Sequence, residues 1–254
     1  LEALERQNIA VEDVDYVIPT HVHLDHAGGA GSMMRAFPNA RLVVHPRGAR
    51  HMIDPSKLIE GSIAVYGADK MKRLYGEILP IDAGRVIEAT DGMTLKLAGR
   101  QLLFLDTPGH AKHHIAVIDE KSNHIFTGDS FGLVLDELAG EQGRFVHPTT
   151  TPVQLDPPAM HATMDRLMSY KPAGMFLTHF GHLSDVDRYG DILHRQVDAF
   201  VDIARQCQEE GAGRHEAIRT ALGEFAIQEA RAVGCRLPES GILEIMDHDL
   251  ELNV

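Results

Sequence analysis

The sequence predicts a layered α/β fold rather than a single parallel sheet. Three observations predict it. An apolar, β-prone run at 14–19 ends in a polar turn and a helix. Short apolar strands separated by turn residues fill 86–127. Residues 157–233 then follow the order helix, strand, helix, helix. Helices are therefore expected to flank sheets made largely of short strands.

The individual elements follow from apolar periodicity and from turn residues. Residues 130–156 are expected to be irregular, as a lid or binding loop or simply as a solvated connection. The expected helices cover 1–10, 27–37, 47–76 with a break at Asp54-Pro55, 157–170, 185–210 and 214–233. The expected strands cover 14–19, 41–45, 86–89, 94–97, 101–105, 114–118, 124–127 and 174–178.

Composition narrows the function classes. The 254 residues carry a net charge of -13, which argues against binding to nucleic acid or to an anionic membrane surface. No apolar run approaches the length needed to span a membrane, and no signal peptide is visible. Cys207 and Cys235 are too few for a disulfide framework, which favours reduced thiols and a cytoplasmic location. The apolar faces of the C-terminal helices leave a homodimer open.

The richest cluster of potential ligands is THVHLDHAGG, residues 20–29. It places His21, His23, Asp25 and His26 within six positions, where a strand turns into a helix. Imidazole and carboxylate bind zinc, iron or manganese at neutral pH. On an extended backbone, side chains two residues apart point the same way. The stretch therefore predicts a metal site, with room for two adjacent ions.

Three later strands also end in residues that can bind metals. The motifs are DTPGH at 106–110, TGDS at 127–130 and THFGH at 178–182. Strand ends meet at one rim of a sheet, where functional sites are normally assembled. Each motif alone is weak, because any of them could be only a turn, but their combination and order are specific.

Together these four motifs resemble the metallo-β-lactamase superfamily of hydrolases, in order and spacing, from about residue 14 to residue 182. The resemblance implies an αββα sandwich with a dinuclear site on one edge of its sheets. Members usually have several strands before the first histidine motif. Residues 1–254 are therefore expected to form a single domain that is incomplete at its N-terminus, with 185–254 as a helical C-terminal extension.

The resemblance also implies metal ligands and a reaction. Two divalent ions are expected, zinc first, with iron or manganese as alternatives. A metal ion lowers the pKa of bound water toward about 7, so a metal-bound hydroxide would attack the substrate. The implied ligands are His21, His23 and His110 for the first ion, Asp25, His26 and His179 for the second, and Asp129 bridging both.

Other side chains near these motifs are expected to have roles besides metal binding. Asp25 could also manage a proton, and His182 could face the substrate as a donor to an oxyanion or leaving group. A supporting or plain loop role is the alternative for His182, and general considerations favour it slightly. One of His113 and His114 could orient a ligand, and Asp106 is expected to be structural.

The sequence thus predicts a dinuclear metal-dependent hydrolase of a small-molecule ester, thioester or lactone. One alternative is a mononuclear-iron oxidoreductase of the persulfide dioxygenase type on the same fold. A second alternative is a non-catalytic metal-binding protein. No nucleic-acid or membrane partner is expected.

Overall fold

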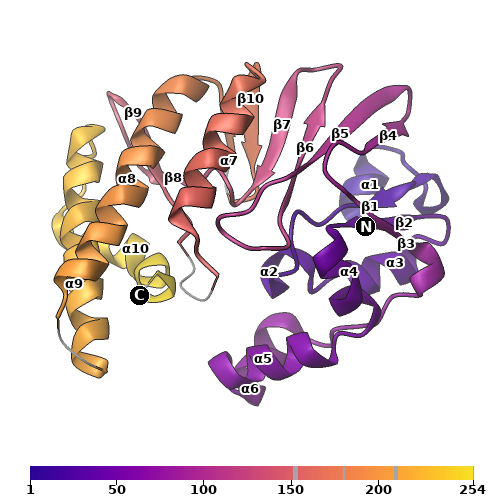
Figure 1. The fold of residues 1–254 in the computed structure, drawn as a ribbon, viewed down its shortest axis with the longest axis horizontal. Coiled ribbons are helices and arrows are strands. Elements are labelled where there is room, and N and C mark those ends of the chain that lie inside the picture. The colour runs from indigo at the N-terminus through magenta and orange to yellow at the C-terminus, as the bar shows by residue number, and fades with distance from the viewer. Residues whose placement is uncertain (151–153, 180, 209–210, 254) are drawn as a thin grey trace. The chain divides into compact units, whose positions relative to one another are not determined.

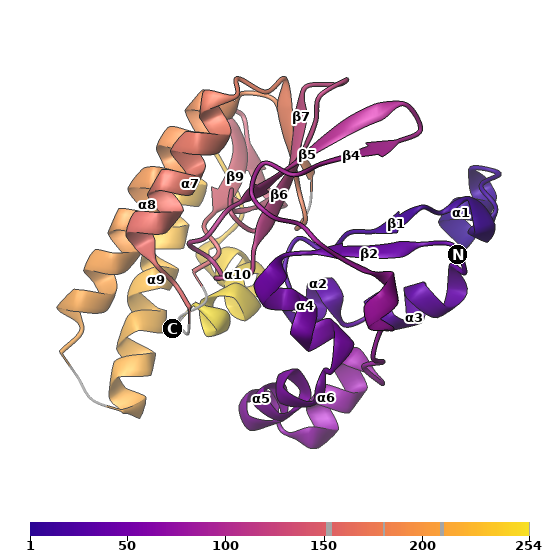
Figure 2. The same cartoon turned by 45° about the vertical axis from the view of Figure 1, so that its right-hand side comes forward.

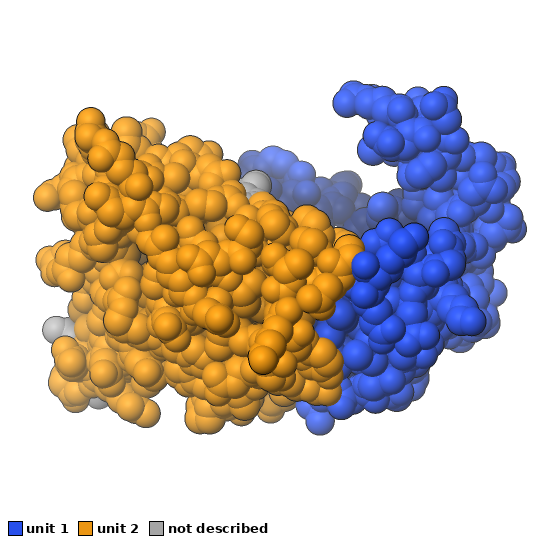
Figure 3. Space-filling view, turned by 90° about the horizontal axis from the view of Figure 1, so that it is seen from above, with its two compact units in different colours: residues 1–106, 113–121 blue, residues 107–112, 122–254 orange. Residues whose placement is uncertain are grey.

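The protein is described here by a computed structural model covering residues 1–150, 154–179, 181–208 and 211–253. The chain forms two compact units (Figures 1 and 3). Unit 1 comprises residues 1–106 and 113–121, and unit 2 comprises residues 107–112 and 122–254. No helix among the described residues is long and apolar enough to cross a membrane.

Unit 1 contains a small parallel sheet with helices packed against it (Figure 2). Leu42 and Val44 of its middle strand are fully buried and pack with Val17 and Met52 in one apolar cluster. The strands are β1 (Tyr16–Val17), β2 (Arg41–Val44) and β3 (Val86–Glu88), in the order β1-β2-β3. The helices that contact them are α3 (Ala30–Ala36) and α4 (Pro46–Ile53).

Unit 1 also contains an antiparallel meander of three strands, all of which the sequence predicted. Ala98 and Gly99 have φ values of 47° and 75°, as a tight two-residue hairpin requires. Phe104, Ile115 and Val117 form the buried face. The strands are β4 (Thr94–Leu97), β5 (Arg100–Asp106) and β6 (Ile115–Asp119).

The remaining helices of unit 1 are short. The break predicted in 47–76 at Asp54-Pro55 is confirmed, because one helix ends at Ile53 and the next begins at Ser56. Asp54 Oδ1 accepts hydrogen bonds from the backbone and side chain of Ser56 across this break. The first helix is shorter than predicted, since Asn8 has a φ of 54°. These helices are α1 (Glu2–Arg6), α2 (Leu24–Ala27), α5 (Ser56–Tyr66) and α6 (Ala68–Tyr75), with 3-10 turns at Val11–Asp13 and Ala83–Arg85.

The part of unit 2 around the later motifs consists of three paired strands and one helix. β7 (His124–Gly128) pairs in parallel with β10 (Gly174–Leu177), which pairs antiparallel with β11 (Gly181–Leu183). α7 (Pro157–Ser169) starts where Asp156 Oδ1 accepts from the backbone N–H of Ala159. The three residues of β11 were not predicted, because so short a strand has no measurable alternation.

The prediction that 130–156 is irregular is wrong for much of that segment. It contains a hairpin of β8 (Leu133–Gly140) and β9 (Gly143–His147). The register of the β8–β9 pairing shifts between Leu135 and Gly140. Such a shift interrupts the alternation of apolar and polar residues from which a strand is predicted. The hairpin packs against α8 and α9, so long-range contacts decide its structure. Residues 151–153 lie outside the described part.

The C-terminal part of unit 2 is helical and shares one apolar core with the β8–β9 hairpin (Figure 1). The two predicted helices are confirmed, but a third was missed. Its buried residues Ile242, Met246 and Leu250 recur every four positions, a spacing that does predict a helix. The helices are α8 (Val186–Gln206), α9 (Ala212–Ala232) and α10 (Glu239–Leu252).

One histidine makes the stability of this core depend on pH. His147, at the end of β9, is buried against Phe145 and Phe200, and burial lowers its pKa from 6.5 to about 4 while Glu229 weakly opposes the shift. Above pH 6.5 the imidazole is neutral in both states. As pH falls toward 4, only the unfolded chain gains the proton, so the unfolding free energy drops by about 3 kcal/mol.

We expect His147→Phe to remove this loss while preserving the ring contacts. Denaturant unfolding at about pH 7 and about pH 5 measures the effect: the variant should lose less unfolding free energy between these values than the parent. The other histidines are common to both proteins and cancel. Equal pH dependence in both proteins would contradict the assignment.

Candidate metal centre

The first motif forms the turn that the sequence predicted. His23 keeps an extended backbone, with φ -61° and ψ 148°, and α2 begins at the next residue. The carbonyl of His23 accepts the backbone N–H groups of His26 and Ala27. The backbone therefore turns sharply after His23, and four potential metal ligands follow one another on a short, hydrogen-bonded segment.

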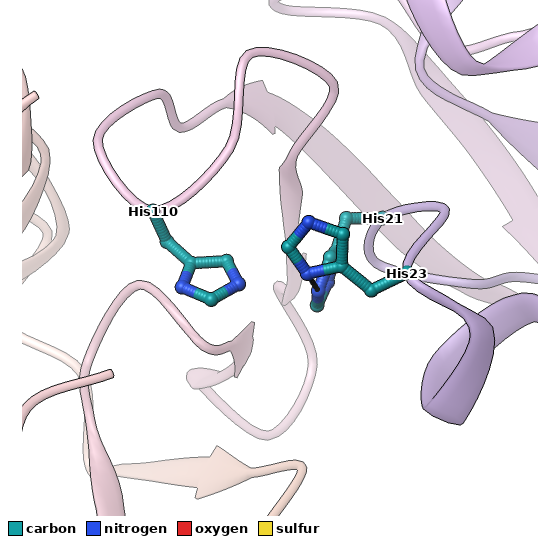
Figure 4. A group of neighbouring side chains, drawn as sticks. All are labelled: His21, His23 and His110. Atoms are coloured by element: carbon teal, nitrogen blue, oxygen red, sulfur yellow. Dashed lines mark hydrogen bonds between the residues drawn. The ribbon is translucent and has the colours of Figure 1, made fainter. Parts of the chain in front are cut away.

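His21 and His23 point toward each other, as their spacing predicted. His21 Nε2 lies 3.0 Å from His23 Nδ1 (Figure 4). Thr20 Oγ1 lies 3.1 Å from the other ring nitrogen of His21, which is fully buried. Two imidazole nitrogens this close share either a proton or a metal ion. Zinc–nitrogen bonds of about 2.0–2.1 Å place neighbouring ligand nitrogens roughly 3.3 Å apart, so the pair fits a shared ion.

Asp25 and His26 complete the ligand group of unit 1. His26 Nε2 lies 3.1 Å from Asp25 Oδ2, and the His26 ring centroid lies 3.9 Å from that of His21. The Asp25 side chain is half exposed, whereas that of His26 is buried. Asp25 is therefore the most exposed of the four ligand candidates in this group.

Two further histidines support this group rather than joining it. His114 is buried and stacks on His21, with ring centroids 4.9 Å apart. His113 Nδ1 accepts the backbone N–H of Val22 at 3.4 Å. The orienting role predicted for one of these residues therefore has contacts in the structure, and His113 fixes the backbone between the two motif histidines.

Unit 2 supplies a second group of three potential ligands. Asp129 Oδ2 lies 3.6 Å from His110 Nε2 and 3.7 Å from His179 Nε2. These separations exceed a hydrogen bond but suit ligands that share an ion. Asp129 is only 4% exposed and His110 only 2%. A buried carboxylate oxygen at nearly equal distances from two imidazole nitrogens is suited to bridge two cations.

A backbone carbonyl determines how His110 can act. His110 Nδ1 lies 2.9 Å from the carbonyl oxygen of Thr149. A carbonyl can only accept, so Nδ1 donates the proton, and in the neutral imidazole Nε2 then presents its lone pair toward Asp129. Thr149 Oγ1 also donates to the Asp129 carbonyl at 2.6 Å. Sequence reasoning missed Thr149, because a residue that acts through its backbone leaves no motif.

The loop before His110 is fastened to the start of α7. Thr163 Oγ1 donates to the Pro108 carbonyl, and the backbone N–H of Asp156 donates to the Gly109 carbonyl. Gly109 has a φ of 136°, and a Cβ there would lie 2.5 Å from the Cα of Met160. Only glycine permits this close approach, which sets the position of His110.

His179 follows β10 and lies near α10. Its carbonyl accepts the backbone N–H of Val134 at 3.2 Å. Burial raises the pKa of the Asp249 carboxyl group, and the charges of His248 and His179 oppose that rise. The third helix of the C-terminal part therefore lies within electrostatic range of a predicted ligand.

His182 lies on β11, opposite Phe176 in the strand register. Its ring centroid is 4.9 Å from that of Phe176 and 5.2 Å from that of His124, and the ring covers Gly174. These contacts describe an aromatic cluster on the strands. The catalytic role of His182 stays a prediction. Phe180 of the same motif lies outside the described residues.

Asp106 has the structural role expected of it. Its Oδ1 lies 3.3 Å from His45 Nε2, and its backbone N–H donates to Asp91 Oδ1. Burial lowers the pKa of His45, while the neighbouring Asp106 carboxylate opposes the shift.

Comparison with known proteins gives the family. The sequence model of the protein family described as the metallo-beta-lactamase superfamily matches residues 1–186. The chain belongs to this superfamily. The predicted fold class, a metallo-β-lactamase-like α/β fold with additional C-terminal helices, is thereby confirmed. All seven predicted metal ligands belong to histidine and aspartate groups that could hold a metal ion.

Several relatives carry names that describe a fold or an activity. A metallo-beta-lactamase fold-containing protein of Sulfurisphaera tokodaii is 28% identical over 68% of this chain and 63% of its own length. A hydroxyacylglutathione hydrolase of Synechococcus is 27% identical over 59% of this chain and 43% of its own length. An atrochrysone carboxyl ACP thioesterase of Aspergillus fumigatus is 26% identical over 46% and 20%. The chain thus spans less than two thirds of these relatives.

Solved structures agree on the fold. A metallo-beta-lactamase family protein of Thermus thermophilus has a TM-score of 0.64 at 21% identity, over 98% of this chain and 79% of that chain. A second structure, described as a di-iron-bound form, has a TM-score of 0.51 at 22% identity, over 72% and 77%.

Gly109→Ala tests how His110 is positioned. The added Cβ would push the loop away from α7 and displace the His110 ring, so we expect metal affinity to fall by about tenfold or more. Competition with a chromophoric chelator measures the affinity. Gly99→Ala is the matched control, because Gly99 also has a positive φ but a Cβ there would meet no atom within 4 Å. Unchanged metal affinity in Gly109→Ala would contradict this account.

Proposed function

We propose that the two ligand groups bind a pair of divalent ions and that the protein hydrolyses a small-molecule ester, thioester or lactone. The observation that carries the proposal is the position of Asp129 Oδ2 between His110 Nε2 and His179 Nε2. The pairing of His21 with His23, and membership of the superfamily, support it.

In this proposal each ligand keeps the role that the motifs implied. Zinc is the proposed metal, because histidine and carboxylate ligands suit it, and iron and manganese are the alternatives for the same donors. His21, His23 and His110 would hold one ion, Asp25, His26 and His179 would hold the other, and Asp129 would be a ligand to both.

Bound divalent ions would lower the pKa of water toward about 7 and polarise a carbonyl oxygen. The protein's own residues set the conditions for this. Thr149 keeps the proton on His110 Nδ1, so that the Nε2 lone pair stays available. The Asp129 carboxyl group is buried away from solvent. Asp25 is half exposed, so its carboxylate can accept a proton and pass it to solvent.

Support for an acyl substrate comes from two relatives, one named a hydroxyacylglutathione hydrolase and the other a thioesterase. The net charge of -13 disfavours polyanionic substrates such as nucleic acids. The two free cysteines, Cys207 and Cys235, support a reducing compartment such as the cytoplasm.

Metal analysis combined with a substrate panel tests the proposal. We expect two zinc-like ions per chain, and hydrolysis of lactones or thioesters rather than of phosphodiesters or β-lactams. One iron per chain with oxygen uptake would instead identify a mononuclear-iron oxidoreductase. Activity confined to phosphodiesters would overturn the substrate assignment.

Variants separate the individual roles. Asp129→Asn should leave at most one ion bound and lower kcat by several orders of magnitude, because the bridging charge is lost. His215→Ala, on α9 beside Glu251, is the control and should retain both ions and full activity. His182→Ala should retain both ions but lose kcat if its ring contacts the substrate. Full metal content and activity in Asp129→Asn would support a non-catalytic binding protein instead.

A further inference from the structure

A side-chain amide at the end of α10 is bound to the segment that follows β9. Asn253 Oδ1 accepts from the backbone N–H of Thr150 at 2.7 Å and from Thr150 Oγ1 at 2.6 Å. Asn253 Nδ2 donates to the carbonyl of Asp249 at 2.6 Å. The amide oxygen thus faces two donors and the amide nitrogen faces an acceptor, so only one orientation of the amide group satisfies all three hydrogen bonds.

Thr150 is the neighbour of the residue that orients two predicted ligands. Thr149 accepts from His110 Nδ1 through its carbonyl and donates to the Asp129 carbonyl through its hydroxyl. Thr149 and Thr150 are both buried. The backbone N–H of Thr150 and the carbonyl of Thr149 belong to the same peptide group. A hydrogen bond that fixes this N–H therefore also fixes the direction of the carbonyl that holds His110.

We propose that Asn253 is a positioning residue for the metal centre. By holding the peptide between Thr149 and Thr150, it aims the Thr149 carbonyl at His110 Nδ1 and keeps the Nε2 lone pair directed toward Asp129. This inference rests on the proposed function, since it assigns a role toward the metal that His110 and Asp129 would bind. Asn253 itself touches neither metal nor substrate.

Helix α10 is anchored well enough to serve as this support. Ile242, Met246 and Leu250 are buried in the core shared with α9 and the β8–β9 hairpin. Arg219 of α9 also pairs with Asp247 of α10. The amide is thus held by a docked helix rather than by an exposed tail.

The geometry also explains why asparagine occupies this position. The amide must accept two hydrogen bonds with its oxygen and donate one with its nitrogen. Aspartate would keep the acceptor but lose the donor to the Asp249 carbonyl, and would place a second carboxylate near Asp249. Alanine would lose all three hydrogen bonds.

The experiment compares Asn253→Ala, Asn253→Asp, Thr150→Val, the Asn253→Ala/Thr150→Val double variant and Arg219→Ala. Arg219→Ala is the matched control, because it loosens α10 from α9 without touching Thr150. Zinc affinity is measured by competition with a chromophoric chelator, and the ligand field by the visible spectrum of the cobalt-substituted protein. Thermal unfolding without metal reports folding separately.

We expect Asn253→Ala to weaken zinc binding by about tenfold and to shift the cobalt spectrum. Thr150→Val should weaken zinc binding less than Asn253→Ala does, because the backbone N–H of residue 150 still donates to Asn253. The double variant should match Asn253→Ala, because both changes act through one contact. Asn253→Asp should recover part of the affinity, because it keeps the acceptor. Arg219→Ala should lower the unfolding temperature but leave zinc affinity and the cobalt spectrum unchanged.

Two results separate failure of this inference from failure of the proposed function. If the parent protein binds no divalent metal, the proposed function fails. If the parent binds metal and Asn253→Ala binds it with equal affinity and an unchanged spectrum, only the positioning role fails. Equal weakening by Arg219→Ala would also overturn it, because general docking of α10 would then account for the effect.

Discussion

The charge of one buried carboxylate is the constraint on which unit 2 depends. Taking an ionised carboxylate out of water costs several kcal/mol unless positive charge compensates it. The Thr149 carbonyl holds a proton on His110 Nδ1, so the neutral imidazole directs the Nε2 lone pair toward Asp129. At 3.6 Å that arrangement is repulsive without a cation. A metal ion removes the repulsion and compensates the carboxylate in one step. A proton on Nε2 would favour a shorter hydrogen-bonded distance.

Several contacts in unit 2 hold His110 and Asp129 in these positions. The loop that carries His110 lies close to α7, where only the small size of Gly109 permits the approach. Thr149 contacts both His110 and the backbone of Asp129, so it couples the positions of two ligands. Asn253 in turn fixes the neighbouring peptide. The ligand geometry thus depends on a series of hydrogen bonds, most of which involve backbone atoms.

This dependence on backbone contacts explains which features the sequence could predict. His21, His23, Asp25 and His26 are adjacent in the chain, so composition and spacing alone predict their grouping. The strands that carry Asp129 and His179 were also predicted, since both are short apolar runs bounded by turns. Thr149 and Asn253 could not be found in this way. They act through a carbonyl and an amide, and the contact between Thr150 and Asn253 joins residues 103 positions apart. The β8–β9 hairpin was missed for a related reason, because contacts with distant helices determine it. Helix α10 differs, since its apolar spacing was present in the sequence.

The two ligand groups should therefore respond differently to change elsewhere in the molecule. The group in unit 1 lies on one short segment, which local hydrogen bonds such as those from His26 and Ala27 to the His23 carbonyl hold together, and His113 adds one distant contact to it. The group in unit 2 joins residues from three separate motifs, and its geometry is maintained by segments that carry no ligand. Substitutions in α7 or α10 can thus alter metal binding without touching a ligand. The amide that holds the Thr149–Thr150 peptide lies at the end of α10. In the proposed arrangement the C-terminal helices would therefore support the metal centre rather than form an accessory extension.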